Sequence, residues 1–432
     1  MKKNFYISIL AIALTALSAQ FLQARNSEGL VKDSVAMGAG YANEIYYSMA
    51  NGQVASVPRA QWDIAFRTPN RSSSIMINEG ASVPGDPSIT GVMLFTYPKS
   101  DTSGWATVDT IGIKAWKPMY NSQDDWENGA FSRNAKGHPD YGWGIYNTVT
   151  HDLVADSLFI IKLRDGTYRK LWMARKYSSL DLYSFRFANL DGSADTKITV
   201  DCNPYKSKNF VGYSIQTSAV VDFEPAANSW DLLFTKYESI QSNGTPYPVT
   251  GVITNDGLKT IEYHHVDPNL LTWDLALADS SRSSIGWDWK TFNMNTFVYE
   301  VEDSLVYFVQ DLAGNMNKLM FTKFEGSSSG KIVFDKATNL ITGISENTGR
   351  NEITVYPNPV NDRLNVHLNN MTSFPMRVTL SALSGQVVYA LTVTKNTGHA
   401  ISIPVNDMPN GMYLLIAKSA SGTSAKKVVV NK

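Results

Sequence analysis

The chain has 432 residues, and at about 150 residues per domain we expect about three domains. Hydrophobic residues make up 43% and charged residues 18%, which is the composition of a folded protein rather than a disordered one. A net charge of −1 excludes a charge-driven partner such as nucleic acid or an anionic membrane. The single cysteine, Cys202, excludes disulfide frameworks, thiolate zinc sites, iron–sulfur clusters and covalently attached c-type haem, because each needs at least two cysteines.

The N-terminal residues 1–24 are predicted to form a secretory signal peptide. Lys2 and Lys3 supply a basic start, and an almost unbroken apolar run covers residues 5–17 and ends in small residues suited to a signal peptidase. The alternative is a membrane-anchoring helix, which needs about 20 apolar residues, and the polar residues from Gln20 onward interrupt the run too early. We therefore expect an exported, soluble mature protein without a transmembrane helix.

The following sequence has short alternating runs rich in Tyr, Trp, Phe, Val and Ile, separated by Gly, Asn, Asp and Pro, which is typical of strands. The runs at 159–163 and 168–173 flank Asp165-Gly166, a dipeptide that predicts a tight hairpin. The one sizeable candidate helix, residues 121–131, lacks an apolar stripe. The sequence predicts an all-β fold.

A self-comparison indicates that the domain at residues 28–196 is duplicated at residues 197–338. The motif Gln61–Phe66 recurs as Ser229–Phe234, each with a Trp-Asp pair. Further matches in the same order join Tyr47-Ser48 to Tyr213-Ser214, Gly142-Trp143 to Gly286-Trp287, Asp156–Leu158 to Asp303–Leu305, and Lys170-Leu171 to Lys318-Leu319. We expect two tandem antiparallel β-sandwich domains.

Two features of these copies carry structural expectations. In each Trp-Asp pair we expect the indole to fill the sandwich core, while the indole N–H and the Asp carboxylate bind backbone groups of the preceding turn. The first copy also carries a longer middle segment that includes residues 101–131. Such an insertion is expected to be a surface loop, where binding residues concentrate.

A third domain is predicted at residues 351–432, after a polar linker at 339–350. Leu364, Val366 and Leu368 alternate with polar residues, as in a strand with one buried face. About seven short strands in this segment predict a small immunoglobulin-like sandwich.

The third domain closely resembles the type A C-terminal sorting domain of the type IX secretion system (Por secretion system) of Bacteroidota. The resemblance rests on a Tyr-Pro-Asn-Pro start, a Leu-x-Val strand, Ser-Gly-Gln-Val, Asn-Gly-Met-Tyr, and a basic pair before the final valines. The residues that carry this sorting signal are Tyr356, Pro357, Asn358, Pro359, Gly385, Gly411, Tyr413, Lys426 and Lys427.

This resemblance implies partners and a location. It implies passage through the Sec translocon, export by the type IX secretion machinery, and handling by a sortase-like peptidase. The mature protein would be secreted, either extracellular or at the outer-membrane surface.

The duplicated region resembles the HmuY-like β-sandwich family of surface haem-binding proteins. The resemblance lies in Trp62–Phe66, Gly142–Asn147 and Leu158–Met173, and the first copy matches better than the second. It implies haem as a possible ligand, held by His or Met from loops at one end of the sandwich.

The candidate haem ligands are His138 and His151, which bracket the Gly142–Asn147 motif. Non-covalent haem needs one or two axial donors such as neutral imidazole. Walls for the macrocycle are expected from Trp126, Tyr141 and Trp143. The competing interpretation is that both histidines are ordinary residues of surface loops.

Catalytic signatures are scarce, so no enzyme, catalytic residue or metal site is predicted. Residues 326–330 satisfy G-x-S-x-G, but a nucleophile elbow needs a following helix, and residues 331–334 are predicted to be a strand. Two functions stay open. The first is a non-enzymatic surface protein that binds haem or another flat aromatic ligand, and the alternative is an adhesin or glycan-binding protein that stacks sugars on exposed aromatic residues.

Overall fold

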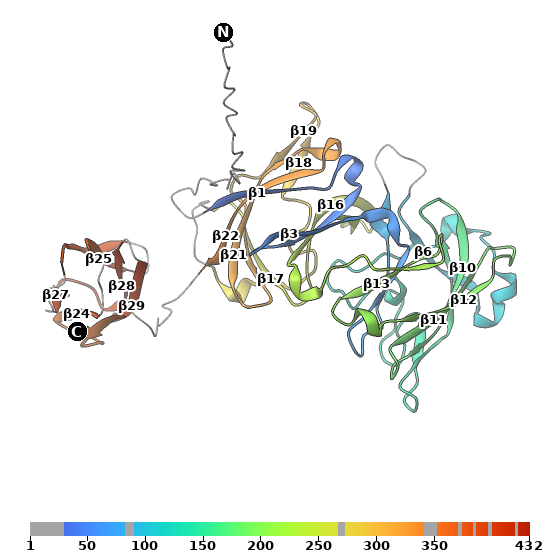
Figure 1. Cartoon of the computed structure of the whole chain (residues 1–432), viewed down its shortest axis with the longest axis horizontal. Helices are drawn as coiled ribbons and strands as arrows, with labels where there is room; N and C mark the ends of the chain where they lie inside the picture. The colour runs from blue at the N-terminus through green and yellow to red at the C-terminus, as the bar shows by residue number, and fades with distance from the viewer. Residues whose placement is uncertain are drawn as a thin grey trace, which may run out of the picture. The chain divides into compact units, whose positions relative to one another are not determined.

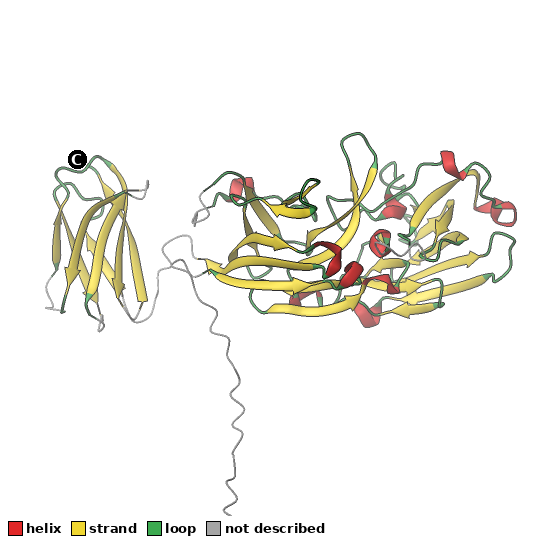
Figure 2. Cartoon of the chain, turned by 90° about the horizontal axis from the view of Figure 1, so that it is seen from above, coloured by secondary structure: helices red, strands yellow, loops and turns green. Residues whose placement is uncertain are grey.

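The computed structural model describes residues 30–82, 90–266, 273–340, 352–369, 374–382, 386–395, 400–419 and 422–432. The predicted signal peptide, most of the predicted linker and Gly385 lie outside these residues. The chain divides between residues 339 and 340 into two compact units. The fold is all-β, as predicted, because every described helical segment is a short 3-10 turn (Figure 2).

The first unit contains two β-sandwich lobes (Figure 1). Lobe A consists of one large sheet and a smaller four-stranded sheet. The large sheet has the order β12-β11-β10-β8-β7, and β9 joins β10 to β6. These strands are β6 (Met93–Asp101), β7 (Gly144–Tyr146), β8 (Leu153–Ala155), β9 (Ser157–Lys162), β10 (Tyr168–Tyr177), β11 (Leu182–Ala188) and β12 (Thr196–Asp201). The smaller sheet is β14 (Ala219–Val221), β13 (Phe210–Ser214), β4 (Ile64–Arg67) and β5 (Ile75–Ile77).

Lobe B has a five-stranded sheet, a four-stranded sheet and a two-stranded hairpin. The five-stranded sheet is β1 (Val31–Ala36), β22 (Lys331–Leu340), β21 (Met316–Phe324), β20 (Val306–Gln310) and β17 (Lys259–Tyr263). The four-stranded sheet is β16 (Pro246–Thr254), β15 (Leu232–Ile240), β2 (Asn43–Ser48) and β3 (Gly52–Pro58). The hairpin is β18 (Lys290–Asn293) and β19 (Val298–Val301).

The 3-10 turns lie between strands. They are η1 (Ala39–Tyr41), η2 (Arg59–Gln61), η3 (Glu79–Ala81), η4 (Thr102–Thr107), η5 (Ile113–Ala115), η6 (Ala130–Ser132), η7 (Asn203–Tyr205), η8 (Ala227–Ser229), η9 (Leu275–Leu277) and η10 (Gly326–Ser328).

The two lobes exchange their first strands, so strand pairing crosses the predicted copy boundary at residue 196. In lobe B, β1 pairs with β22 and β2 pairs with β15, with Tyr47 opposite Leu232. In lobe A, β12 pairs with β11 and β13 pairs with β4, with Tyr213 opposite Ile64. The first strands of the first copy, β1 and β2, therefore belong to lobe B with most of the second copy. The first strands of the second copy, β12 and β13, belong to lobe A with most of the first copy.

The two Trp-Asp motifs make the same backbone contacts across this exchange. The backbone N–H of Asp63 donates to the Tyr213 carbonyl oxygen at 2.9 Å, and the backbone N–H of Asp231 donates to the Tyr47 carbonyl oxygen at 2.8 Å. The Asp63 carboxylate accepts the N–H of Ile215 at 2.7 Å, and the Asp231 carboxylate accepts that of Met49 at 2.6 Å. The carboxylates thus bind backbone groups as expected, but those groups belong to the exchanged strand.

The sequence also predicted that each indole ring of the Trp-Asp pairs fills a sandwich core and that its N–H binds the preceding turn, and this prediction is wrong. Trp62 and Trp230 are buried in an apolar cluster between the lobes, and neither indole N–H donates to a backbone group of the preceding turn. Separate cores fill the two sandwiches, with Phe66, Phe159 and Trp143 in lobe A and Phe234, Phe334 and Trp289 in lobe B.

The inserted segment 101–131 is not a freely exposed loop. Trp105 and Val108 pack against Leu158 and Ile160 in a second apolar layer of lobe A. Trp126 reaches the cluster between the lobes and donates its indole N–H to the Thr254 carbonyl oxygen at 3.1 Å. The segment is held by burial of these large rings. The candidate helix at 121–131, which lacked an apolar stripe, does not form, and the turn η6 is the helical element there.

The second unit is the predicted immunoglobulin-like sandwich. One sheet is β23 (Glu352–Tyr356), β24 (Arg363–Asn369) and β27 (Ile401–Pro404), and the other is β26 (Val387–Val393), β25 (Met376–Ala382), β28 (Gly411–Ser419) and β29 (Gly422–Val430). The core contains Leu364 and Val366, and the partly buried Leu368 packs against it, as the alternating pattern predicted. In the described residues no helix is long and apolar enough to cross a membrane.

Candidate binding groove

A groove of about 790 Å³ opens in lobe B between η1, β16 and the β18–β19 hairpin. This volume lies in the range of small-molecule binding sites. Five aromatic side chains line the groove: Tyr41, Tyr247, Trp287, Phe292 and Tyr299. The aromatic lining comes from segments far apart in sequence, which the sandwich brings together.

The outer aromatic rings of the groove are accessible. Tyr247 is 55% exposed and Phe292 is 40% exposed. The ring centroids of Tyr247 and Trp287 lie 6.2 Å apart, and those of Phe292 and its cross-strand partner Tyr299 lie 5.0 Å apart. The groove therefore offers two pairs of aromatic rings to a ligand with flat apolar faces.

Close backbone contact holds the Trp287 segment on β16. Val252 and Gly286 exchange backbone hydrogen bonds of 2.8 and 3.1 Å. A Cβ atom on Gly251 would lie only 2.4 Å from the Gly286 carbonyl oxygen, so glycine is required at position 251. The Trp287 indole N–H donates to Ser239 Oγ at 3.1 Å, which fixes the ring beside Tyr247.

Two lysines also line the groove. Lys290 donates its ammonium group to the carbonyl oxygens of Thr250 and Trp287 at 2.6 and 3.1 Å. Lys236 donates to the carbonyl oxygen and the hydroxyl of Ser82, both at 2.8 Å. Burial lowers the pKa of Lys290 to about 7 and that of Lys236 to about 8.

The two predicted haem ligands lie in lobe A, and the structure brings both to one tyrosine. The His138 and Tyr146 ring centroids are 5.4 Å apart, and those of Tyr146 and His151 are 6.0 Å apart. The Tyr146 hydroxyl is 2.6 Å from His151 Nδ1. Both histidines are exposed.

The His151 position has an equivalent in lobe B. Asn147 closes the β7–β8 turn by accepting the N–H groups of Val149 and Thr150, and Asn293 does the same in the β18–β19 turn. Each turn ends in a residue with positive φ, which is His151 at 62° in lobe A and Phe297 at 55° in lobe B. By this register Trp143 corresponds to Trp289, not to Trp287 as the sequence match indicated, and both Trp143 and Trp289 are fully buried.

Two of the three predicted haem walls are core residues. Trp143 donates its indole N–H to the Ser73 carbonyl oxygen at 3.1 Å inside lobe A, and Trp126 is buried between the lobes. Tyr141 is partly buried, and its ring lies 6.3 Å from that of His138. Within the described residues, no group of three or more His, Cys, Asp or Glu side chains is arranged to hold a metal ion.

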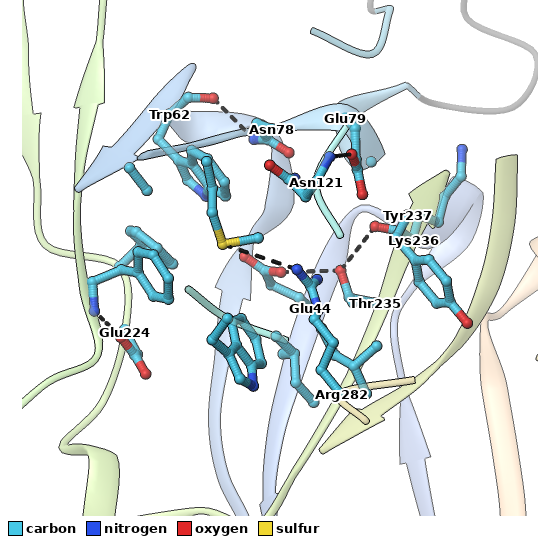
Figure 3. Close-up of a pocket in the computed structure, with 18 of the residues that line it drawn as sticks. Glu44, Trp62, Asn78, Glu79, Asn121, Glu224, Thr235, Lys236, Tyr237 and Arg282 are labelled. Carbon is cyan, nitrogen blue, oxygen red and sulfur yellow. Dashed lines mark hydrogen bonds between the residues drawn. The ribbon is translucent and has the colours of Figure 1, made fainter. Parts of the chain in front are cut away.

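A second, smaller cavity of about 60 Å³ lies between the lobes (Figure 3). It is lined by the buried carboxyl groups of Glu44, Glu79 and Glu224, and burial raises the pKa of each to about 7. Glu44 accepts a hydrogen bond from Thr235 at 3.0 Å through one of its carboxylate oxygens. The volume suits a few water molecules rather than an organic ligand.

The sorting-signal residues lie around the last strand of the second unit. The Asn358 side chain donates to the Lys427 carbonyl oxygen at 2.8 Å and accepts the Val429 N–H at 2.7 Å. Lys426 and Lys427 are part of β29, and Gly411 opens the neighbouring strand β28. Tyr413 donates its hydroxyl to the Pro409 carbonyl oxygen at 2.8 Å. Tyr356 stacks on His367 at a centroid distance of 5.4 Å.

Comparison with known proteins identifies the second unit. Residues 354–431 match the family model of the secretion system C-terminal sorting domain. No curated protein matches the chain. Among solved structures, dimeric latent PorU from Porphyromonas gingivalis is similar at 12% identity and a TM-score of 0.15. That match covers 92% of this chain, which spans about a third (34%) of the PorU chain.

The sorting domain shows that the protein is handled by the type IX secretion system and is secreted or located at the cell surface. The HmuY-like resemblance of the first unit stays a prediction. The groove residues were missed in the sequence because they are single aromatic residues in separate strands, turns and loops. The one signal that pointed toward them was the recurring aromatic-Asn pair, Tyr146-Asn147 and Phe292-Asn293.

Proposed function

We propose that this exported chain is a non-enzymatic binding protein, and that the groove of lobe B holds a carbohydrate. The observation that carries the proposal is the groove itself, with its two accessible pairs of aromatic rings. The C–H groups on one face of a pyranose ring pack well against the electron-rich face of an aromatic ring. A concave site lined mainly by aromatic side chains, with a few polar groups, is the usual form of a ligand-binding site.

Polar groups at the rim suit sugar hydroxyls. Asp288, Thr291 and Ser327 line the groove beside the aromatic rings, and all three are exposed. A few such polar groups around an apolar floor are the usual means by which a binding site fixes the orientation of its ligand.

The local structure supports a role in binding rather than hydrolysis. Ser328 is the serine of the G-x-S-x-G match, and it ends the turn η10, after which β22 begins at Lys331. A nucleophile elbow needs a strand before the serine and a helix after it. Ser328 is exposed and donates its hydroxyl to the Glu325 carbonyl oxygen at 3.1 Å.

A glycan array probed with the purified mature chain, followed by calorimetric titration of the best ligand, tests this proposal. Trp287→Ala is expected to weaken binding about tenfold, because one well-placed aromatic contact contributes about 1.4 kcal/mol. Trp116→Ala is the matched control, because this partly buried tryptophan packs in lobe A. Absence of binding to every glycan, or equal affinity of Trp287→Ala and the unchanged chain, would overturn the proposal.

Haem is the second candidate ligand, favoured by the convergence of His138 and His151 on Tyr146. Both imidazoles are exposed and can approach an iron. Because the Tyr146 ring contacts both imidazoles, ligation of one iron by both requires Tyr146 to move aside. Titration with hemin tests this candidate.

A further inference from the structure

We infer that the carbohydrate of this groove is acidic, and that its carboxylate or sulfate group pairs with the ammonium groups of Lys236 and Lys290. This inference rests on the proposed function and names the chemical class of its ligand. Both lysines line the groove, one from β15 and one from the start of β18. They come from different sheets, so the fold of lobe B brings the two cations to one site.

The two lysines are buried cations without a direct counter-ion. Lys236 is 8% exposed and Lys290 is 7% exposed. Among the described residues, neither ammonium group has a carboxylate within 4.0 Å, and the hydrogen-bond acceptors of both are carbonyl oxygens and one hydroxyl. The Lys290 ammonium also lies over the rings of Trp289 and Phe324, at 4.1 and 4.9 Å from their centroids. Each ammonium has three N–H donors, and each donates to two acceptors among the described residues. Burying a cation without an anionic partner is costly, and a ligand anion removes that cost.

The surrounding charges leave the site cationic at neutral pH or below. Asp288 is the charged group that acts on Lys290, whereas Arg59 and then Glu238 act on Lys236, and Arg59 adds a further positive charge there. Asp288 is exposed, and burial raises the pKa of Glu238 to about 7. Neither carboxylate restores the lysine pKa values to their usual range.

This arrangement predicts a pH signature for ligand binding. An anion stabilises the ammonium form, so binding raises both lysine pKa values and takes up protons when the pH lies near 7 to 8. Affinity for an acidic glycan is therefore highest below pH about 7 and falls as the pH rises through about 8. A neutral glycan on the same aromatic rings gains nothing from the charges, and its affinity stays flat over this range.

A purely structural role for the lysines makes a different prediction. If Lys236 and Lys290 only tie loops together through carbonyl oxygens, their replacement would weaken acidic and neutral glycans alike. Comparing matched glycans therefore separates a charge contact from loss of local structure.

The test uses the full mature chain and an array that carries uronate, sialylated and sulfated glycans beside their methyl-esterified, desialylated or desulfated counterparts. The best acidic ligand and its neutral counterpart are then titrated between pH 6 and pH 9. Lys290→Met and Lys236→Met keep the apolar stem and remove the charge, and Lys197→Met, an exposed lysine of β12 in lobe A, is the matched control. Tryptophan fluorescence of each variant verifies folding.

We expect the acidic ligand to bind at least tenfold more tightly than its neutral counterpart at pH 6, and to lose this advantage by pH 9. Each groove variant should lose about tenfold more affinity for the acidic ligand than for the neutral one. If Lys290→Met does not fold, Lys236→Met and the pH series of the unchanged chain decide the question. Equal binding of acidic and neutral glycans overturns this inference and leaves the proposed function standing, whereas absence of all glycan binding overturns both.

Discussion

Replacement of Asp63 by Ala is expected to destabilise the first unit strongly, because this carboxylate joins segments of both predicted copies. The Asp63 side chain is fully buried, accepts the Arg164 Nε–H at 2.8 Å, and accepts the backbone N–H groups of Ile215 and Gln216 at 2.7 and 3.3 Å. The substitution leaves the buried Arg164 guanidinium without its anion and two N–H groups without their acceptor. Removing one partner of a buried ion pair costs about 3–5 kcal/mol of unfolding free energy.

Urea unfolding followed by tryptophan fluorescence measures this cost in the mature chain. Nine of the ten tryptophans lie in the first unit, and none lies in the sorting domain, so the fluorescence signal reports mainly the first unit. Asp195→Ala is the control, because Asp195 pairs with Arg186 at the surface, with side-chain exposures of 31% and 23%. An exposed pair contributes less than about 1 kcal/mol. Equal losses for the two variants would refute the structural role given to Asp63.

Three further predictions concern pH, export and haem. The three buried carboxyl groups between the lobes have pKa values raised from 4.5 to about 7, so the folded state binds more protons than the unfolded state between these pH values. The melting temperature is therefore expected to fall as the pH rises from about 4.5 to about 7, and Glu44→Gln should reduce the slope of melting temperature against pH. An unchanged slope in this variant would exclude the role given to Glu44. Deletion of Lys426–Lys432 removes the buried Val428 and Val430 from the sorting-domain core, so the protein should remain in the periplasm. Cell fractionation measures this, and normal delivery to the cell surface would contradict the role of β29. If haem binds at Tyr146, hemin should give a sharpened, red-shifted Soret band that the double variant His138→Ala, His151→Ala abolishes, and an unchanged spectrum in that variant would exclude these ligands.

The fold class could be predicted because local patterns determine it. The alternation of Leu364, Val366 and Leu368 specifies one buried face, and the structure places those residues as expected. The turn at Asp165-Gly166 forms between β9 and β10, with Gly166 at φ 79°, as the dipeptide predicted. Such signals depend only on neighbouring residues.

The strand exchange could not be predicted, because strand pairing depends on partners far apart in the chain. Tyr47 and Tyr213 occupy equivalent places in the two repeats, and the sequence match is the same whether each strand pairs within its own copy or with the other copy. The choice depends on which sandwich each opening hairpin reaches, and no local residue pattern encodes that choice.

The candidate site was predicted only in part. The histidines of lobe A were found because they bracket a repeated motif, and the structure shows that His151 occupies the turn position held by Phe297 in lobe B. The groove in lobe B escaped notice because Tyr41 and Tyr299 lie at opposite ends of the first unit's sequence, and only packing brings them together. Exposure of an aromatic ring depends on that packing.

Hydrogen–deuterium exchange of the mature chain, with and without the tightest glycan from the array, tests the central claim most directly. The groove predicts slower exchange in peptides that cover residues 246–254 and 286–301, with no change at residues 138–151 of lobe A. Protection confined to residues outside those two segments, or no protection at a saturating glycan concentration, would contradict the claim that this groove is the binding site.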